Sequence, residues 1–437
     1  MKDKIKKSLD FSFINGIFSN AMAGFTQDYL TPFILLLGGT ARQVGMLNAF
    51  PNLLSALVQL KSPDITEWFK NRKKTVLIFV FIEAVILVLI AAAAVLGRMQ
   101  PYLFILLMAF YSGSAGIVNP AWGSWISNLV EPKNRAEFFG RRNRIYGFVS
   151  IGSTFLAGLL LFNMKRINPF YGFAILFGFA FICRLIGFYY LTKIYEPPLF
   201  YDRSQRFSMA QFLGHIRKSN YARFVVFIAF LSFAVNLASP FFAVLMLKDL
   251  KFSYLLYTML VISAALTRHL SISRWGSHAD RVGNLKIIKF VSLFIGIIPL
   301  FWIISRNPAF LVFAQVFAGF LWAGFYLCTS NFIYDAAAPE KRTRCIAYFN
   351  VLHGFAIFLG ALTGGLILNK LPPLFGHKIL TLLLISAVLR IVVVVIFEPM
   401  VREVRPVHKI NNKQLFYSMI NYKTILGIDR KSAKYMN

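Results

Sequence analysis

The chain has 437 residues, of which 57% are hydrophobic and only 15% are charged, whereas a soluble globular domain is about half apolar and about a quarter charged. Its formal net charge is +30, but the basic residues lie almost entirely in short segments between apolar runs. Because no pattern typical of an RNA-binding, zinc-finger or helix-turn-helix module is present, nucleic acid is excluded as an expected partner. The composition predicts a polytopic membrane protein embedded in a lipid bilayer.

Twelve apolar runs are long enough to cross a bilayer as helices of about 20 residues. We therefore expect an all-α polytopic membrane protein with twelve transmembrane helices. The runs lie at about 11–37, 43–60, 75–97, 102–129, 144–163, 171–193, 224–247, 253–275, 286–305, 308–335, 344–369 and 376–398.

The first run could be mistaken for a secretory signal peptide, because Ala21-Met22-Ala23 imitates a cleavage site. However, Asn15 and Asn20 interrupt the apolar region, and the run continues to Leu37. We expect an uncleaved first spanning helix.

Asp28 lies in this first run, within the stretch GFTQDYLTPF, and is the only charged residue between Asp10 and Arg42. Carboxylates inside membrane spans are costly and usually face a partner or a water-filled cavity. Two interpretations are open. Asp28 is either an outer-end acid satisfied by Arg42 or by backbone groups, or a cavity residue that carries a proton or holds a cationic group.

The great majority of Lys and Arg residues lie in alternate loops and in the two tails. By the positive-inside rule, this predicts a cytoplasmic (inner or plasma) membrane location with both termini in the cytoplasm. The cysteines (Cys183, Cys328 and Cys345) and the isolated histidines have no metal-ligand spacing, so neither a disulfide framework, a metal site nor a cofactor is expected.

The two halves of the chain match at an offset of about 207 residues. Pro101 aligns with Pro308, Arg135 with Arg342, and Asp28 with Asn236. These matches predict an N-terminal six-helix bundle (1–193), a cytoplasmic basic linker (194–223), a C-terminal six-helix bundle (224–398) and a basic cytoplasmic tail (399–437). The linker would be either an interfacial amphipathic helix or a solvated connector.

The loop after the eighth run reads Gly276-Ser277-His278-Ala279-Asp280-Arg281-Val282-Gly283-Asn284-Leu285-Lys286. It resembles the G-x-x-x-D-R-x-G-x-x-K loop of the major facilitator superfamily. The equivalent loop of the first half is a degraded copy, in which Glu67 stands at the acidic position and Lys70 replaces the glycine. Together with twelve runs and a six-plus-six repeat, the resemblance covers about residues 10–400. It implies two pseudo-symmetric bundles around a central site.

In this superfamily the first, fourth, seventh and tenth helices line the central cavity. The resemblance therefore suggests polar and aromatic residues on those helices as candidates for binding a solute or ion. The candidates are Asp28, Gln27, Asn20, Asn119, Trp122, Asn236, Trp322, Tyr326 and Asn331.

The same resemblance assigns the two loops to gating, through contacts that latch the halves in one conformation; the alternative is that they only set topology. The gating candidates are Glu67, Arg72, Gly276, Asp280, Arg281, Gly283, Arg135 and Arg342.

Two further charges, Glu83 and Arg184, lie at similar depths in the third and sixth runs. Because those helices are neighbours in the superfamily, we predict an intramembrane ion pair with either a structural or a coupling role. Arg390, the repeat mate of Arg184, has no acid at a matching depth, and we expect its side chain to extend toward the membrane surface.

The resemblance predicts a monomeric secondary transporter that moves a small organic solute by alternating access, with protons as a candidate coupling ion. A net negative cavity around Asp28 favours a neutral or cationic solute. No phosphate-binding GxxxxGK[ST] motif is present, so no ATP-driven step is expected, and no catalytic constellation indicates an enzyme. The alternative function is a non-transporting membrane receptor or sensor on the same fold.

Overall fold

The computed structural model describes residues 2–131, 135–197, 219–336 and 342–404. These residues are nearly all helical, and they contain no strand beyond an isolated bridge between Leu374 and His377. The predicted linker and tail fall largely outside the described residues.

The first half contains six long helices, and the first of them is interrupted near its end. Its elements are α1 (Lys2–Thr26), the 3-10 turn η1 (Gln27–Tyr29), α2 (Leu30–Leu36), α3 (Ala41–Phe69), α4 (Arg72–Val95), α5 (Pro101–Ser127), α6 (Arg135–Met164) and α7 (Pro169–Lys193).

The second half repeats this order, again with an interruption in its first long helix. Its elements are α9 (Asn220–Asn236), α10 (Phe241–Val244), the π turn η3 (Leu245–Asp249), α11 (Tyr254–Val282), α12 (Asn284–Ile304), α13 (Pro308–Ala336), α14 (Arg342–Ile367), the short turn η4 (Leu368–Lys370), α15 (Lys378–Phe397) and the short turn η5 (Glu398–Met400).

Ten helical segments within the described residues are long and apolar enough to cross a membrane. The segments α1 and α3 have comparable lengths of 25 and 29 residues, but each carries charged residues at the end that overruns its apolar run. The predicted run 43–60, for example, continues as helix to Phe69. The sequence therefore located the apolar part of each helix better than its end.

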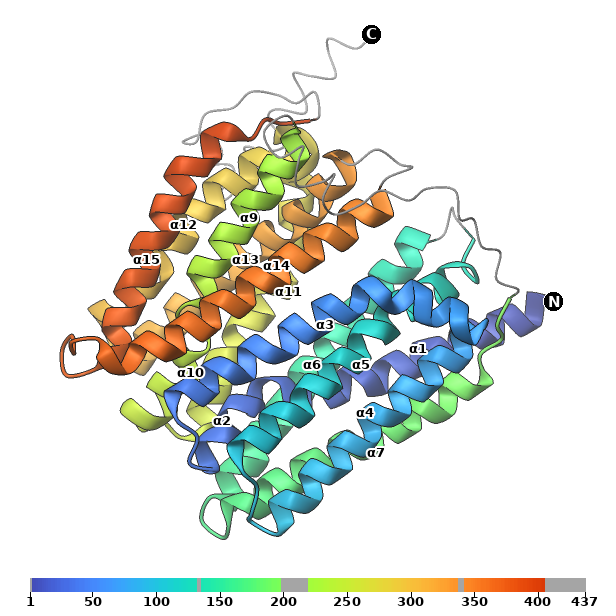
Figure 1. Cartoon of the computed structure of the whole chain (residues 1–437), viewed down its shortest axis with the longest axis horizontal. Coiled ribbons are helices and arrows are strands. Elements are labelled where there is room, and N and C mark those ends of the chain that lie inside the picture. Colours follow the sequence, from blue (N-terminus) through green and yellow to red (C-terminus); the bar gives the residue numbers. More distant parts are fainter. Residues whose placement is uncertain (1, 132–134, 198–218, 337–341, 405–437) are drawn as a thin grey trace.

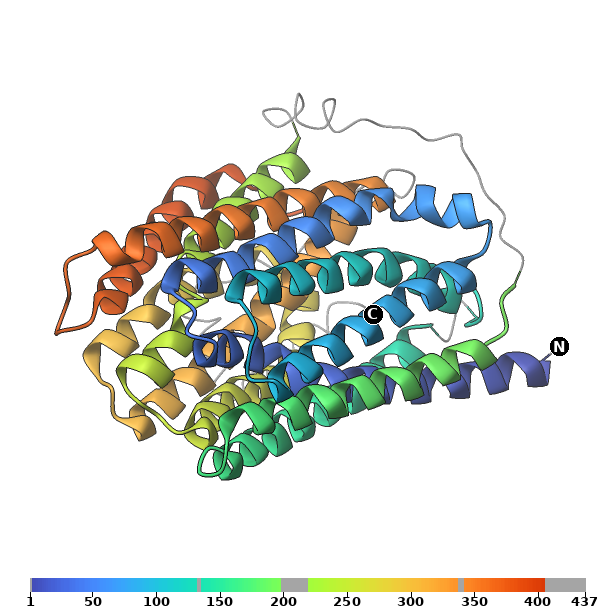
Figure 2. The ribbon, with the colours of Figure 1, turned by 60° about the horizontal axis from the view of Figure 1, so that its bottom comes forward.

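The helices form two groups, α1–α7 and α9–α15, which converge at one end of the molecule and separate toward the other (Figure 1; Figure 2). The converging end carries the loops at 37–40, 96–100, 165–168, 250–253, 305–307 and 371–377. The opposite end, which carries the first and last described residues, is called the termini end below.

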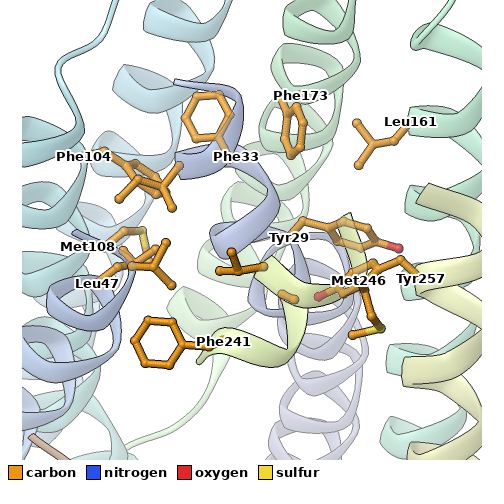
Figure 3. Packing of buried hydrophobic residues seen from close by; sticks show 14 of the residues in the cluster. Tyr29, Phe33, Leu47, Phe104, Met108, Leu161, Phe173, Phe241, Met246 and Tyr257 are labelled. Carbon is orange, nitrogen blue, oxygen red and sulfur yellow. The ribbon is translucent and has the colours of Figure 1, made fainter. Parts of the chain in front are cut away.

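The buried core explains this shape. One large cluster draws buried residues from both halves, including Phe33, Phe104, Phe241 and Leu245 (Figure 3). The fully buried members of the other two clusters each come from a single half. Apolar packing therefore joins the halves at the converging end, while each half has its own core toward the termini end.

Small residues let the two halves approach closely. The helices α3 and α14 pack along each other, as do α6 and α11. A Cβ on Gly45 of α3 would lie only 2.6 Å from the Ala361 carbonyl oxygen, and a Cβ on Gly158 of α6 would lie 2.1 Å from Thr258 Oγ1. These contacts require glycine, as is common where membrane helices cross.

Candidate functional site

The first helix breaks at Asp28, and a proline explains why. Residue 32 is proline and has no N–H, so it cannot donate the helical hydrogen bond to the carbonyl of residue 28. The helix changes there to the 3-10 turn Gln27–Tyr29. The freed Asp28 carbonyl instead accepts a hydrogen bond of 2.6 Å from the Tyr257 hydroxyl, which belongs to the other half.

The second half repeats the same device. Pro240 cannot donate to the carbonyl of Asn236, and α9 ends at Asn236 before the short α10 begins at Phe241. The sequences Thr31-Pro32-Phe33 and Ser239-Pro240-Phe241 therefore follow equivalent helix breaks, which place Asp28 and Asn236 at matching positions. The sequence predicted the match of these two residues, but it did not predict the breaks.

A hydrogen-bonded group of hydroxyls joins the halves beside Asp28. The Tyr29 hydroxyl donates to the Thr154 carbonyl at 2.6 Å and lies 2.7 Å from Thr258 Oγ1. Tyr29 and Tyr257 meet edge to face, with ring centroids 6.3 Å apart (Figure 3). Because Thr258 and Tyr257 are on α11 whereas Tyr29 and Thr154 are in the first half, these bonds hold the converging end closed.

A cavity of about 660 Å³ lies between the two halves next to this closure, within the size range of small-molecule sites. Most of its walls come from the middle of α11 and α13, from α6, α9 and α14, and from the two helix breaks, and α3, α12 and α15 contribute one residue each. A smaller cavity of about 220 Å³ between α9, α13 and α14 shares Phe325, Tyr326 and His353 with it.

Five of the nine sequence-predicted binding candidates line the large cavity. They are Gln27, Asp28, Asn236, Trp322 and Tyr326.

The other four candidates lie elsewhere. Asn20 donates to the Gly16 carbonyl of its own helix at 2.8 Å, and Asn119 is exposed outside the cavity lining. The Trp122 ring packs against the Arg142 guanidinium, whose central carbon is 4.5 Å from the ring centroid. Asn331 also lies outside the lining. The helix α5, which corresponds to the fourth run, contributes no residue to the lining of this cavity.

The cavity carries more charge than the sequence analysis assigned to it. Besides Asp28, its lining includes Arg268 and His269 on α11, His353 on α14 and Arg390 on α15. The Arg268 charge acts electrostatically on Asp28 and on Tyr326. The sequence shows Arg268 as a cation inside a span, but the family pattern predicts that other helices line the cavity.

Arg390 does not extend toward the membrane surface as expected; its side chain is only 2% exposed. Its guanidinium donates to Ser386 Oγ at 3.1 Å, to the Ile295 carbonyl at 3.1 Å and to the Val235 carbonyl at 3.3 Å. Backbone carbonyls inside the half therefore stabilise a buried cation that no acid accompanies among its recorded contacts in the described chain.

Glu83 and Arg184 form the predicted ion pair between α4 and α7. Both side chains are buried, and Arg184 also donates to Ser19 Oγ on α1 at 3.2 Å. The pair lies outside the cavity lining and connects three helices of the first half, an arrangement that favours the structural role.

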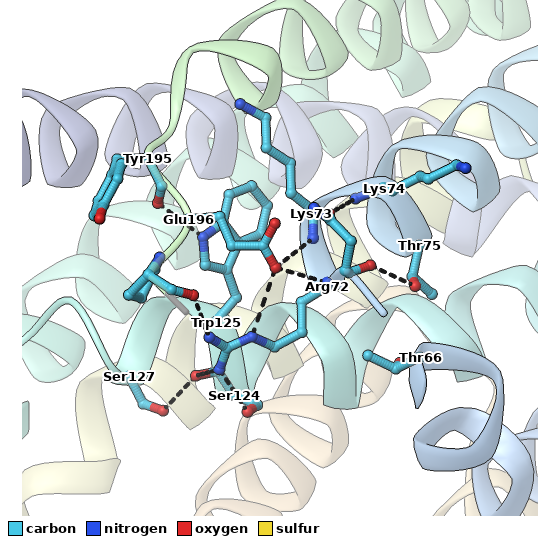
Figure 4. Close-up of polar contacts among 12 residues, drawn as sticks. Thr66, Arg72, Lys73, Lys74, Thr75, Ser124, Trp125, Ser127, Tyr195 and Glu196 are labelled. Atoms are coloured by element: carbon cyan, nitrogen blue, oxygen red, sulfur yellow. Dashed lines mark hydrogen bonds and ion pairs between the residues drawn. The ribbon is translucent and has the colours of Figure 1, made fainter. Parts of the chain in front are cut away.

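The gating candidate Arg72 is held within its own half (Figure 4). The Glu196 carboxylate accepts from the backbone N–H groups of Arg72 at 2.7 Å and Lys73 at 3.2 Å. The Arg72 guanidinium donates to Ser124 Oγ at 3.2 Å and to the Pro197 carbonyl at 3.2 Å. An acid thus neutralises the N-terminus of α4, where the helix dipole is positive.

Glu403 makes the equivalent contact in the second half. Its carboxylate accepts from the Leu285 N–H at the start of α12 at 2.7 Å. The turn before it uses Gly283 at φ 89°, and Lys70 at the equivalent turn of the first half also has a positive φ, of 53°. In these contacts Glu403 is therefore the counterpart of Glu196.

The remaining gating candidates are placed as follows. Glu67 is in the last turn of α3, and Gly276, Asp280 and Arg281 are in the last two turns of α11. The Arg135 and Arg342 side chains lie outside the part of the chain whose side chains are described.

Comparison with known proteins agrees with this architecture. The family model described as Major Facilitator Superfamily matches residues 13–271 and 228–424. No curated protein sequence matches the chain.

Several solved transporter structures have the same fold. A mutant of the nucleoside transporter NupG is 14% identical, with a TM-score of 0.74, over 90% of this chain and 100% of that chain. An auto-inhibited POT family peptide transporter is 13% identical, with a TM-score of 0.71, over 93% and 99%. A D-xylose-proton symporter is 13% identical, with a TM-score of 0.69, over 92% and 98%. At these identities the likeness shows the fold alone.

Proposed function

Because the chain belongs to the major facilitator superfamily, we propose that this integral membrane protein is a secondary active transporter that moves a small organic solute by alternating access. The observation that carries the proposal is the cavity of about 660 Å³ between two repeated halves, beside an end held closed by contacts between them. A central site between parallel repeats is what alternating access requires. Membership of a transporter family points to transport rather than catalysis.

The distribution of basic residues supports an orientation for the transporter. Lys and Arg residues concentrate in the segments at the termini end, which the positive-inside rule places in the cytoplasm. In that orientation the halves are joined on the outer side of a cytoplasmic membrane and separate toward the cytoplasm. The structure then corresponds to the inward-facing conformation of the cycle.

The paired contacts at the termini end support a gating role for the two loops. Glu196 and Glu403 each stabilise the N-terminus of the helix that follows a loop. The loops would then move as rigid parts of their halves, and the contact between the halves at that end would form or break as a unit.

Asp28 is the proposed coupling residue. It lies in a helix break on the cavity wall, and its carboxylate has no hydrogen bond or ion pair among those recorded for the described residues, although its backbone carbonyl is bound by Tyr257. A carboxylate placed in this way can accept a proton from one side and release it to the other.

The cavity lining changes the expected charge of the solute. The sequence predicts a neutral or cationic solute from a net negative cavity around Asp28, but Arg268 and Arg390 also line the cavity. The lining therefore no longer favours a neutral or cationic solute.

Uptake by purified protein in proteoliposomes tests the transport function. We expect a solute to accumulate when a proton gradient is imposed, and Asp28→Asn to remove the dependence of uptake on that gradient. The control is Asp249→Asn, which changes an acid at the converging end that contacts His377 at 3.5 Å. Unchanged coupling in Asp28→Asn would eliminate Asp28 as proton carrier. Solute binding without any flux would instead favour the receptor function.

A further inference from the structure

Arg268 differs from Arg184 and Arg390, two buried arginines of the spans. Arg184 is paired with Glu83, and Arg390 is bound by three acceptors. The Arg268 side chain is exposed on the cavity, and no hydrogen bond or ion pair of its guanidinium is recorded among the described residues. A charge inside a membrane span is costly unless it faces a partner or a water-filled cavity. Its position in the cavity therefore points to a ligand that enters and leaves.

The charges around the cavity favour an anion as that ligand. Arg268 and Arg390 contribute two positive charges to the lining, while Asp28 contributes the single carboxylate. With His269 and His353 neutral, one positive charge is in excess. Uncompensated charge in a low-dielectric site is unfavourable, and one negative charge on the solute would balance it.

The surroundings of Arg268 also favour an apolar or aromatic body on the solute. Trp322 and Tyr326 stack on each other on α13, with ring centroids 5.1 Å apart and planes 24° apart, and both line the cavity. The Arg268 charge acts on Tyr326 as well as on Asp28. The guanidinium therefore shares the cavity with an aromatic wall and a carboxylate, and its planar fork matches a carboxylate group on the solute.

From these observations we propose that the transported solute is an organic monoanion with an apolar or aromatic body, and that Arg268 binds its carboxylate. This inference rests on the proposed transport function. Asp28 repels the same carboxylate and directs it toward Arg268. A proton on Asp28 removes that repulsion, so the proton and the anion favour each other's binding.

The test uses the full chain in proteoliposomes and in detergent. A library of small metabolites is divided into anionic, zwitterionic, neutral and cationic pools, and each pool is offered to the proteoliposomes. Mass spectrometry identifies what accumulates. In parallel, the thermal unfolding midpoint of the purified protein is measured with each pool, because a ligand that binds the folded state raises it.

We expect uptake and a raised midpoint with the anionic pool alone. Arg268→Gln should weaken anion binding about 10- to 100-fold, since a hydrogen bond to a charged group contributes about 1.5–3 kcal/mol. Arg268→Lys keeps the charge without the fork and should weaken binding less. The matched control is Arg306→Gln, which changes an arginine that lies over the Phe375 ring outside the cavity and should bind as the wild type does.

Each other outcome has a definite meaning. Uptake from the cationic, neutral or zwitterionic pool alone overturns the inference and leaves the transport function standing, as does anion uptake that Arg268→Gln does not change. A raised midpoint with anions but no uptake supports the anion site and contradicts transport. No uptake and no shift with any pool contradicts both. If Arg268→Gln does not fold, the inference is tested by the selectivity of the wild type for the anionic pool and by anion binding to Arg268→Lys.

Discussion

The two halves of this protein share a backbone device but differ in charge. Both break their first helix four residues before a proline, at Asp28 and at Asn236. Both also carry an arginine at the matching place in their last helix. In the first half Arg184 is paired with Glu83, whereas in the second half Arg390 is bound by carbonyls and a serine. At these matched positions, therefore, the first half holds Asp28 and an arginine paired with an acid, whereas the second half holds Asn236 and an arginine with no acid among its recorded contacts in the described chain.

Two halves with the same fold can therefore form a site whose charge is asymmetric. The repeat preserves where the helices break and where a cation is buried, because those features set the backbone and packing. The charge of the cavity then depends on whether an acid lies at each helix break and beside each buried cation. Substitutions at three places test this comparison of the two halves, and they follow in order of decreasing expected effect.

Glu83→Gln breaks the ion pair of the first half and should have the largest effect on stability. It leaves Arg184 buried without a counter-charge, which is expected to cost about 3–5 kcal/mol of folding free energy. The measurement is the thermal unfolding midpoint of the purified protein. The double variant Glu83→Gln with Arg184→Gln should recover much of the loss. A single variant as stable as the wild type would show that the pair does not stabilise the first half.

Glu196→Ala compares the two helix-terminal acids and should have an intermediate effect. It leaves the N–H groups of Arg72 and Lys73 without their acceptor, at an expected cost of about 2 kcal/mol. Glu403→Ala removes the matching contact of the second half, in which the carboxylate accepts from the Leu285 N–H at the start of α12. Unfolding midpoints of the two variants measure the two losses. A variant of either acid that is as stable as the wild type would contradict this account of the two contacts.

Tyr257→Phe weakens the link between the halves and should have the smallest effect. It removes the donor to the Asp28 carbonyl, worth about 1 kcal/mol, and shifts the balance toward opening of the converging end by about fivefold. The measurement is the rate at which an impermeant thiol reagent labels Thr31→Cys from that side. The control is Tyr254→Phe, one turn earlier on α11, because the Tyr254 hydroxyl has no recorded hydrogen bond in the described chain. With this substitution, Thr31→Cys should be labelled at the same rate as in the protein that keeps both tyrosines. Equal rates in both variants would remove Tyr257 from the closure.

Much of the fold follows from patterns that survive in one sequence. Apolar runs set the spans, the repeat offset matched Asp28 with Asn236, and similar depth in adjacent helices predicted the Glu83–Arg184 pair. Each of these depends on distance along the chain. The helix breaks were less visible, because Pro32 and Pro240 are tolerated inside membrane helices and the sequence alone does not show which carbonyl loses its partner.

The cavity lining was predicted less well because it depends on how each helix is rotated. Asn119 and Trp122 are polar or aromatic residues on a helix that the family pattern placed at the cavity, yet neither is among the residues that line it, and Trp122 packs against Arg142. Arg268 lies within one of the predicted spans, but spacing within either half does not encode that it lines the same cavity as Asp28. Arg390 was misjudged because two of its three acceptors, the Ile295 and Val235 carbonyls, come from other helices of its own half.

The distance between the two halves at each end of the molecule tests the central claim most directly. Spin labels at Lys165→Cys and Lys370→Cys report the converging end, and labels at Lys61→Cys and Ser277→Cys report the termini end; all four positions are exposed. Cys183, Cys328 and Cys345 are replaced beforehand. Alternating access predicts that a transported solute or a proton gradient lengthens the first distance and shortens the second. Unchanged distance distributions at both ends while solute crosses the membrane would contradict it.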